Sequence, residues 1–146
     1  MHILSPLRPG GSEARFYQGR HASLTIERPA SDVVVLRFTG RDVGEFGDTP
    51  FRELERTIGE VLMVEIFVDA RTTAGASLDV SADWAQWMIT HRDRIRRLNI
   101  LCGSRFIELT AGFVQRFTQF GSRMRIYTEA AAFDEALGQT GKRGLS

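Results

Sequence analysis

The chain alternates between two hydrophobic periods, one typical of strands and the other of helices. In residues 22–27, Leu24 and Ile26 are apolar and their neighbours are polar or small, which predicts a half-buried strand. Residues 33–38 are apolar at almost every position and predict a strand that is covered on both faces. A short polar turn, 28–32, separates the two segments, so we expect them to pair as an antiparallel hairpin.

Helical and strand patterns then alternate to the end of the chain. Asp48 and Pro50 predict a helix start, because a capping side-chain oxygen and a first-turn proline both favour one. Three amphipathic helices are predicted, and their inward positions are Phe51, Leu54, Ile58, Val61 and Leu62; Val80, Trp84, Trp87, Met88, His91 and Ile95; and Phe106, Leu109, Phe113, Phe117 and Phe120. Further strands are predicted at 64–69, 98–103 and 123–127, and a short final helix at 130–137.

The predicted order is β-β-α-β-α-β-α-β-α. Strands that alternate with helices favour a single α/β domain, in which a mixed, mainly parallel five-stranded sheet carries about four helices. A length of 146 residues is typical of one domain. We expect residues 1–20, rich in proline and glycine, to form a flexible arm, residues 21–138 the domain, and residues 139–146 a flexible tail.

Composition excludes several functional classes. A formal net charge of +1 gives no global attraction to nucleic acid or anionic lipid. No apolar run approaches the roughly 18 residues of a membrane span, and the N-terminus lacks a secretory signal, so a cytoplasmic location is expected. Cys102 is the only cysteine; it permits no internal disulfide, and in its apolar strand it is expected to be a small buried hydrophobe.

The sequence contains no recognisable catalytic constellation. His2 and His21 fall in or near the predicted arm, and His91 is expected to be a partly buried helix residue. Metal-ligand spacings, a Gly-x-Ser-x-Gly elbow, a Walker loop and a dinucleotide fingerprint are all absent from the sequence. We therefore predict a protein that is not an enzyme and needs no cofactor or metal.

The predicted loop 70–79 follows the strand 64–69 and leads into a helix. Carboxyl ends of parallel strands are the usual binding edge of an α/β sheet, so we expect a contact surface there. The predicted partner-binding residues are Asp69, Arg71, Thr72, Thr73, Ser77, Asp79 and Trp84. Hydroxyls in this segment either bond within the loop and cap the helix or, at Ser77 and Thr73, accept a phosphate.

Two other features leave alternatives open. The third helix has an apolar surface wider than a single core stripe, which is either core or a face for an apolar ligand; its residues are Phe106, Ile107, Phe113, Val114 and Phe117. Arg92, Arg94, Arg96 and Arg97 follow the second helix. They form either a solvated helix end that complements the dipole or a site for an acidic partner.

The element order, the strand 33–40, the stretch Ile66-Phe-Val-Asp69 and the final helix 130–137 together resemble the STAS domain family, which includes anti-sigma-factor antagonists. The stretch from His91 to Leu101 is most similar to the sporulation-antagonist-like (SpoIIAA-like) or STAS/SEC14 branch. The resemblance implies a non-enzymatic regulatory domain that binds a protein partner, such as an anti-sigma-like kinase, with self-association as a variant.

In family members that switch, a kinase phosphorylates a serine in an Asp-Ser-Ser/Ala-Gly motif at the start of the corresponding helix. The matching stretch here is Ser77-Leu-Asp-Val, with leucine about where the phosphoserine stands. The resemblance therefore implies partner binding without the usual serine switch. The alternative function is a carrier or sensor of an apolar small molecule or lipid.

Overall fold

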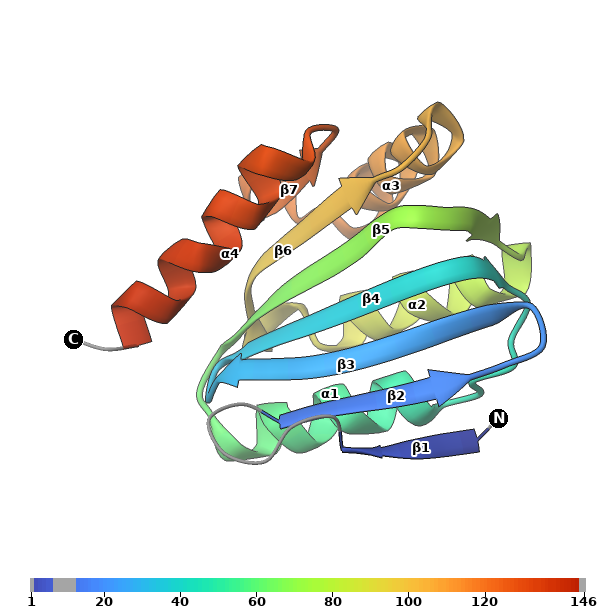
Figure 1. Cartoon of the computed structure of the whole chain (residues 1–146). Helices are drawn as coiled ribbons and strands as arrows, with labels where there is room; N and C mark the ends of the chain where they lie inside the picture. The colour runs from blue at the N-terminus through green and yellow to red at the C-terminus, as the bar shows by residue number, and fades with distance from the viewer. Residues whose placement is uncertain (1, 7–12, 145–146) are drawn as a thin grey trace.

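One sheet of seven strands forms the body of the molecule (Figure 1). The computed structural model describes the backbone of residues 2–6 and 13–144, and all side chains of these ranges except 2–6, 13, 106, 107, 109, 110, 113, 117, 118 and 141–144. The strands are β1 (His2–Pro6), β2 (Glu13–Gln18), β3 (Ala22–Ala30), β4 (Val33–Asp42), β5 (Val64–Ala76), β6 (Ile95–Cys102) and β7 (Met124–Tyr127).

The strands lie in the sheet in the order in which they occur in the chain. β1 to β4 pair antiparallel, and β4 to β7 pair parallel. The prediction of a single mixed α/β domain is confirmed. The predicted number of strands was too low, and the predicted proportion of parallel strand pairs was too high. Both differences arise because β1 and β2 lie in the segment predicted as an arm. Tyr17 of β2 pairs with Leu24 and is 1% exposed, so burial against β3 outweighs the surrounding prolines and glycines.

Three helices cover one face of the sheet and one covers the other (Figure 1). The first face carries α1 (Thr49–Glu60), α2 (Leu78–Thr90) and α3 (Arg105–Thr118), and the second carries α4 (Ala130–Gly144). Short 3-10 turns at Arg92–Arg94 and Gly121–Arg123 precede β6 and β7. The last helix is longer than predicted, since it runs through part of the expected tail to Gly144. No helix in the described part of the chain is long and apolar enough to cross a membrane.

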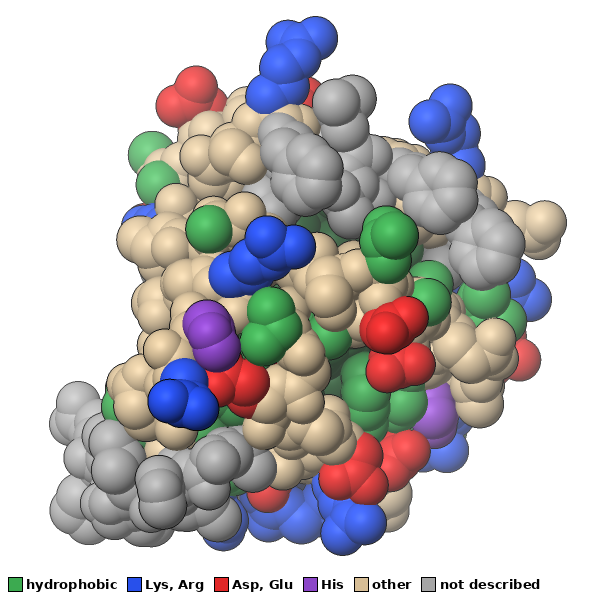
Figure 2. Space-filling view, turned by 90° about the vertical axis from the view of Figure 1, so that its right-hand side faces the viewer, with side chains coloured by type: hydrophobic (Ala, Val, Ile, Leu, Met, Phe, Trp, Pro, Cys, Tyr) green, Lys and Arg blue, Asp and Glu red, His purple; other side chains and the backbone are tan. Residues whose placement is uncertain are grey.

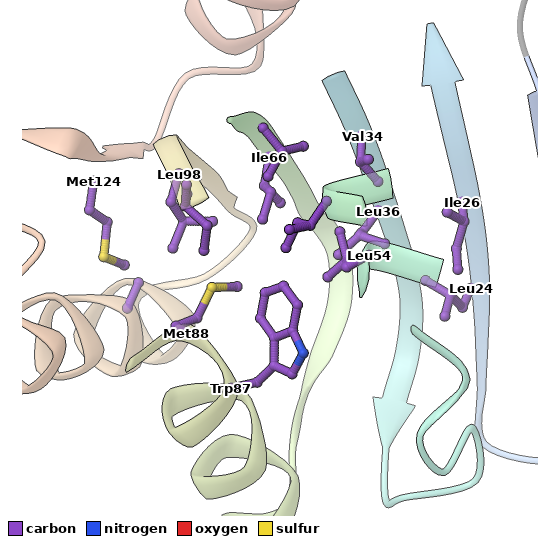
Figure 3. Packing of buried hydrophobic residues seen from close by; sticks show 14 of the residues in the cluster. Leu24, Ile26, Val34, Leu36, Leu54, Ile66, Trp87, Met88, Leu98 and Met124 are labelled. Atoms are coloured by element: carbon purple, nitrogen blue, oxygen red, sulfur yellow. The ribbon is translucent and has the colours of Figure 1, made fainter. Parts of the chain in front are cut away.

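β4 supplies both hydrophobic cores because its side chains alternate between the two faces. Val34 and Leu36 enter the larger core, where they meet helix residues such as Leu54 and Trp87 (Figure 3). Val33 and Val35 enter the smaller core. The smaller core is completed by Phe67, Leu101 and Phe133. The continuous apolar run was therefore interpreted correctly as a strand covered on both faces.

Cys102 lies in a hydrophobic core, and Arg94, which follows α2, is hydrogen-bonded to backbone carbonyls. Cys102 belongs to the larger core, and burial, with Glu108 nearby, raises the pKa of its thiol to about 11, which keeps it protonated at neutral pH. Arg94 donates hydrogen bonds to the carbonyls of Ile58 and Val61, both at 2.7 Å, and to that of Leu62 at 2.9 Å. It therefore binds carbonyls at and just beyond the C-terminus of α1, rather than those of α2, which ends at Thr90.

Replacing Gly103 with alanine should destabilise the fold by about 2 kcal/mol or more, because overpacking forces the backbone to shift. A Cβ at this position would lie 2.2 Å from the carbonyl oxygen of Arg71. Gly59→Ala is the matched control, since a Cβ there meets nothing within 4 Å and alanine is the better helix former by about 0.5–1 kcal/mol. Urea denaturation measures both; equal stability of the two variants would contradict the prediction.

Candidate functional site

The segment predicted as a loop is the second half of β5. The strand runs to Ala76 and keeps its parallel pairing with β4, from Thr39↔Thr72 to Asp42↔Ala76. Two threonine hydroxyls reinforce the pairing. Thr73 Oγ1 donates to the carbonyl of Gly40 at 2.7 Å and Thr72 Oγ1 to that of Phe38 at 3.3 Å. The prediction of a loop over 70–79 is therefore wrong, because a strand neighbour stabilises a small-residue segment whose composition is typical of loops.

The end of β5 places the start of α2 beside the end of β4. Ser77 is the N-cap of α2, and its Oγ accepts a hydrogen bond from the Val80 N–H at 3.2 Å. The backbone N–H of Ser77 donates to the carbonyl of Asp42 at 2.9 Å. Of the two capping residues considered from the sequence, the structure thus uses Ser77, and the helix begins against the last residue of β4.

A cleft of about 180 Å³ lies between α2 and the connection from β4 to α1. Its lining combines aromatic and aliphatic side chains with aspartates, and consists of Asp42, Gly44, Phe46, Gly47, Asp48, Pro50, Phe51, Val80, Asp83 and Trp84. Figure 2 looks toward this end of the molecule and shows acidic side chains gathered beside hydrophobic ones. The cleft therefore has an apolar interior and an acidic rim.

Asp42 is the buried acid of the cleft. Its side chain accepts a hydrogen bond from the Gly44 N–H at 3.0 Å, and the residue is only 7% exposed. Within the described residues it forms no ion pair. Burial raises the pKa of its carboxyl, Gly44 opposes that effect, and the negative charge of Glu45 adds to it. Because the side chain is buried, an ionised carboxylate at this position lowers the stability of the folded protein.

The other acids near the cleft differ in how they are paired. Asp48 forms an ion pair with Arg52 at 2.9 Å, and it lacks the side-chain capping bond to α1 that its position predicted. Asp79 and Asp83 are exposed, and neither forms an ion pair in the described part of the chain. Together with Asp42, they leave this edge of the sheet with negative charge that is not neutralised.

Trp84 forms an aromatic wall of the cleft. Its ring lies 4.6 Å from that of Phe51 at an interplanar angle of 61°, and 6.1 Å from that of Phe38 in an edge-to-face arrangement. Trp84 is half-buried. Trp87, by contrast, is buried and donates its indole N–H to Glu55 at 3.3 Å. Of the two tryptophans, Trp84 is the one available at the cleft.

Two exposed apolar residues lie within two positions in the chain of residues that line the cleft. Leu78 is 88% exposed at the first turn of α2, and Val43 is 44% exposed directly after Asp42. Among the described residues the only other large hydrophobic this exposed is Leu62, at 83%, beyond the C-terminus of α1. Asp42, Val43 and Leu78 were not among the predicted site residues, because no local pattern shows that the end of β4 meets the start of α2.

Asp69 and Arg71 lie elsewhere than the other predicted site residues. Asp69 is buried, and its carboxylate accepts from Arg37 at 2.6 Å and from Arg71 at 3.0 Å. Arg71 also pairs with Asp134 of α4 at 2.7 Å. These residues form a series of ion pairs on the α4 side of the sheet. By contrast, Ser77 caps α2, and Asp79 and Trp84 belong to that helix. The predicted partner-binding set is therefore divided between two places.

The other sequence-based sites remain predictions. Val114 packs against the larger core, while the side chains of Phe106, Ile107, Phe113 and Phe117 lie outside the described residues, so an apolar-ligand face on α3 is untested. Phosphorylation of Ser77 or Thr73 is untested too. Three or more His, Cys, Asp or Glu side chains placed to hold a metal ion do not occur in the described part of the chain.

Comparison with known proteins identifies the fold. No protein-family model matches the chain, and no curated protein matches it. An uncharacterised DUF3478-family protein from Shewanella loihica PV-4, with a SpoIIAA-like fold, matches at a TM-score of 0.61 and 17% identity, over 83% of this chain and 98% of that chain. The anti-sigma factor antagonist SpoIIAA in its unphosphorylated form matches at 0.50 and 16%, over 79% and 96%. The chain thus has the STAS-like fold that the resemblance predicted.

Ser77→Ala should cost about 1 kcal/mol of stability, the usual loss when an N-cap oxygen is removed. Ser77→Asp should retain most of that stability, because aspartate caps equally well and its charge suits the helix N-terminus. Ser81→Ala, within α2, is the control, and urea denaturation is the measurement. A loss from Ser77→Ala no greater than that from Ser81→Ala would show that the cap contributes little.

Asp42→Asn should be at least as stable as the native protein at pH 7, and the two should converge as the pH falls below about 4. The folded state raises the pKa of Asp42 above its ordinary value of 3.8. It therefore holds the proton more tightly than the unfolded chain does, and the native protein loses stability as the pH rises through this range. Free energies of unfolding between about pH 3 and 8 test this; a variant less stable at pH 7 than at pH 3, relative to native, would contradict it.

Proposed function

We propose that the chain is a non-enzymatic regulatory domain that binds a protein partner through the surface around the cleft. This partner surface consists of the cleft together with Val43, Leu78 and Asp79. The observation that carries the proposal is that exposed Leu78 and Val43 flank an aromatic-walled cleft with unpaired aspartates. Trp84 lines this cleft, and tryptophan is one of the residue types enriched at energetically important interface positions.

Burial of the exposed side chains would supply part of the binding energy. Fully burying a leucine side chain contributes about 1.5–3 kcal/mol, and Leu78 is 88% exposed. A partner that covered Leu78 and Val43 would therefore gain from both. Aspartates around these side chains give the surface a polar, acidic rim that favours a basic partner and raises the rate of association.

The fold supports a regulatory role. One of the solved structures with this fold is an anti-sigma factor antagonist, and we transfer that class of function, binding of a protein regulator such as an anti-sigma-like kinase, to this chain. Leu78 stands about where switching members of the STAS family carry a phosphorylated serine. We therefore propose that the contact is constitutive rather than controlled by phosphate at that position.

The cleft lining limits the chemistry that the described residues could perform. The described residues that line it include three aspartates but no serine, cysteine, lysine or histidine side chain. A nucleophile beside a base, the usual arrangement of covalent catalysis, is not among them. A cleft of about 180 Å³ is also smaller than the roughly 300–1,000 Å³ of most small-molecule sites.

Affinity capture with matched variants tests the proposal. The native protein, Leu78→Asp and Leu62→Asp serve as baits in a lysate of the native host at physiological salt. Leu62→Asp is the control because Leu62 is 83% exposed but lies between the end of α1 and the start of β5, at the other end of the parallel strands from the partner surface. We expect a protein that is recovered in stoichiometric amount with native and Leu62→Asp baits and lost with Leu78→Asp.

Affinity measured with the purified partner should weaken at least about tenfold in Leu78→Asp, or about 1.4 kcal/mol. Equal recovery by all three baits, or turnover of a metabolite by the native protein, would overturn the proposal. If the chain binds a second copy of itself here, light scattering would detect a dimer that Leu78→Asp dissociates and Leu62→Asp does not.

A further inference from the structure

We infer that the cleft receives the side chain of an arginine from the protein partner, with its guanidinium between Asp42 and Asp83 and against the aromatic wall. This inference rests on the proposed function, because it names the chemical group by which the partner surface recognises its partner. Three features of the cleft lead to it: its size, its charge and its aromatic lining.

The size of the cleft suits one long side chain. Its volume is about 180 Å³, below the roughly 300–1,000 Å³ of most small-molecule sites. Phe46, Pro50 and Val80 give it an apolar lining, which matches the methylene stem of a long basic residue. Such residues bury their stems along apolar surface while their charged heads meet polar groups.

The charge of the cleft requires a cation. Asp42 is 7% exposed and accepts a hydrogen bond from the neutral backbone N–H of Gly44. Among the described residues, neither Asp42 nor Asp83 forms an ion pair. Buried charges in proteins are normally paired. Acids elsewhere in the described chain follow that rule, since Asp69 meets two arginines and the buried Glu65 lies within 3.9 Å of Arg96 and Arg97. No cation among the described residues supplies a counter-charge to Asp42, so we expect the partner to supply it.

The aromatic wall favours arginine over other cations. A guanidinium is planar, stacks on aromatic rings and binds carboxylates through two parallel hydrogen bonds. Trp84 is the strongest type of aromatic partner for a cation, and Phe51 lies beside it. A lysine ammonium is a compact, strongly hydrated charge that gains less from such a wall. A metal ion would need a closer set of ligands than the described residues provide.

Titration of the full chain with N-acetyl-L-argininamide, followed by two-dimensional amide and indole NMR, tests the inference. Saturable shifts are expected at Asp42, Gly44 and the Trp84 indole. The neutral isostere N-acetyl-citrullinamide should bind at least about fivefold more weakly, as should N-acetyl-lysinamide. Asp42→Asn combined with Asp83→Asn should abolish the shifts, and Asp93→Asn, an exposed acid at the opposite end, should leave them unchanged.

Citrulline binding equal to arginine binding, shifts that survive the double variant, or no shift at these residues up to about 50 mM probe would overturn the inference. Failure here is distinguishable from failure of the proposed function. If Leu78→Asp loses a captured partner while the arginine probe does not bind, the partner surface stands and the arginine assignment falls. If the probe binds but no partner depends on Leu78, the cation site stands and the proposed function falls.

Discussion

The parallel pairing of β4 with β5 positions both hydrophobic cores and the cleft. The paired strands expose apolar side chains on both faces, so Val34 and Ile66 reach the larger core while Val35 and Phe67 reach the smaller one. The same pairing continues to Asp42↔Ala76, where it aligns the end of β4 with the N-cap of α2. A shift of this register by one residue would exchange the two faces and displace the cleft.

The two ends of the parallel strands use charge in opposite ways. At the amino-terminal end, arginines are bound within the chain: Arg94 satisfies the carbonyls at the end of α1, and Arg96 lies 3.5 Å from Glu65. At the carboxyl-terminal end, Asp42 has a raised pKa and no cation among the described residues. The hydrogen-bonded and paired arginines stabilise the fold, whereas a buried carboxylate without a cation lowers its stability. Proteins commonly retain such a loss of stability where function requires it.

The location of the site could be predicted from the sequence, but its shape could not. The junction between a buried strand and the following helix indicated the edge of the sheet at which the cleft lies, since parallel strands present their carboxyl ends there. Whether residues 70–76 form a loop or a strand depends on pairing with β4, which no local pattern of small residues reveals. Asp69 was assigned to the contact surface for its position along the chain, but its side chain turns to the α4 face and pairs with Arg37.

Hydrophobic periodicity alone determined the order of the elements from β3 onward and the strand that serves two cores, because those patterns record which faces exclude water. Two residues predicted to face inward from helices were placed wrongly, since Leu62 is 83% exposed beyond the end of α1 and Ile95 is the first residue of β6. Only the tertiary structure decided that β2 joins the sheet through Tyr17, that β5 extends to Ala76, and that Asp42 and Leu78 stand beside one cleft. Such features depend on contacts between residues far apart in the chain, whose favourable energies override local composition. The cleft is therefore a property of the assembled fold, even though its place on the sheet follows from the sequence.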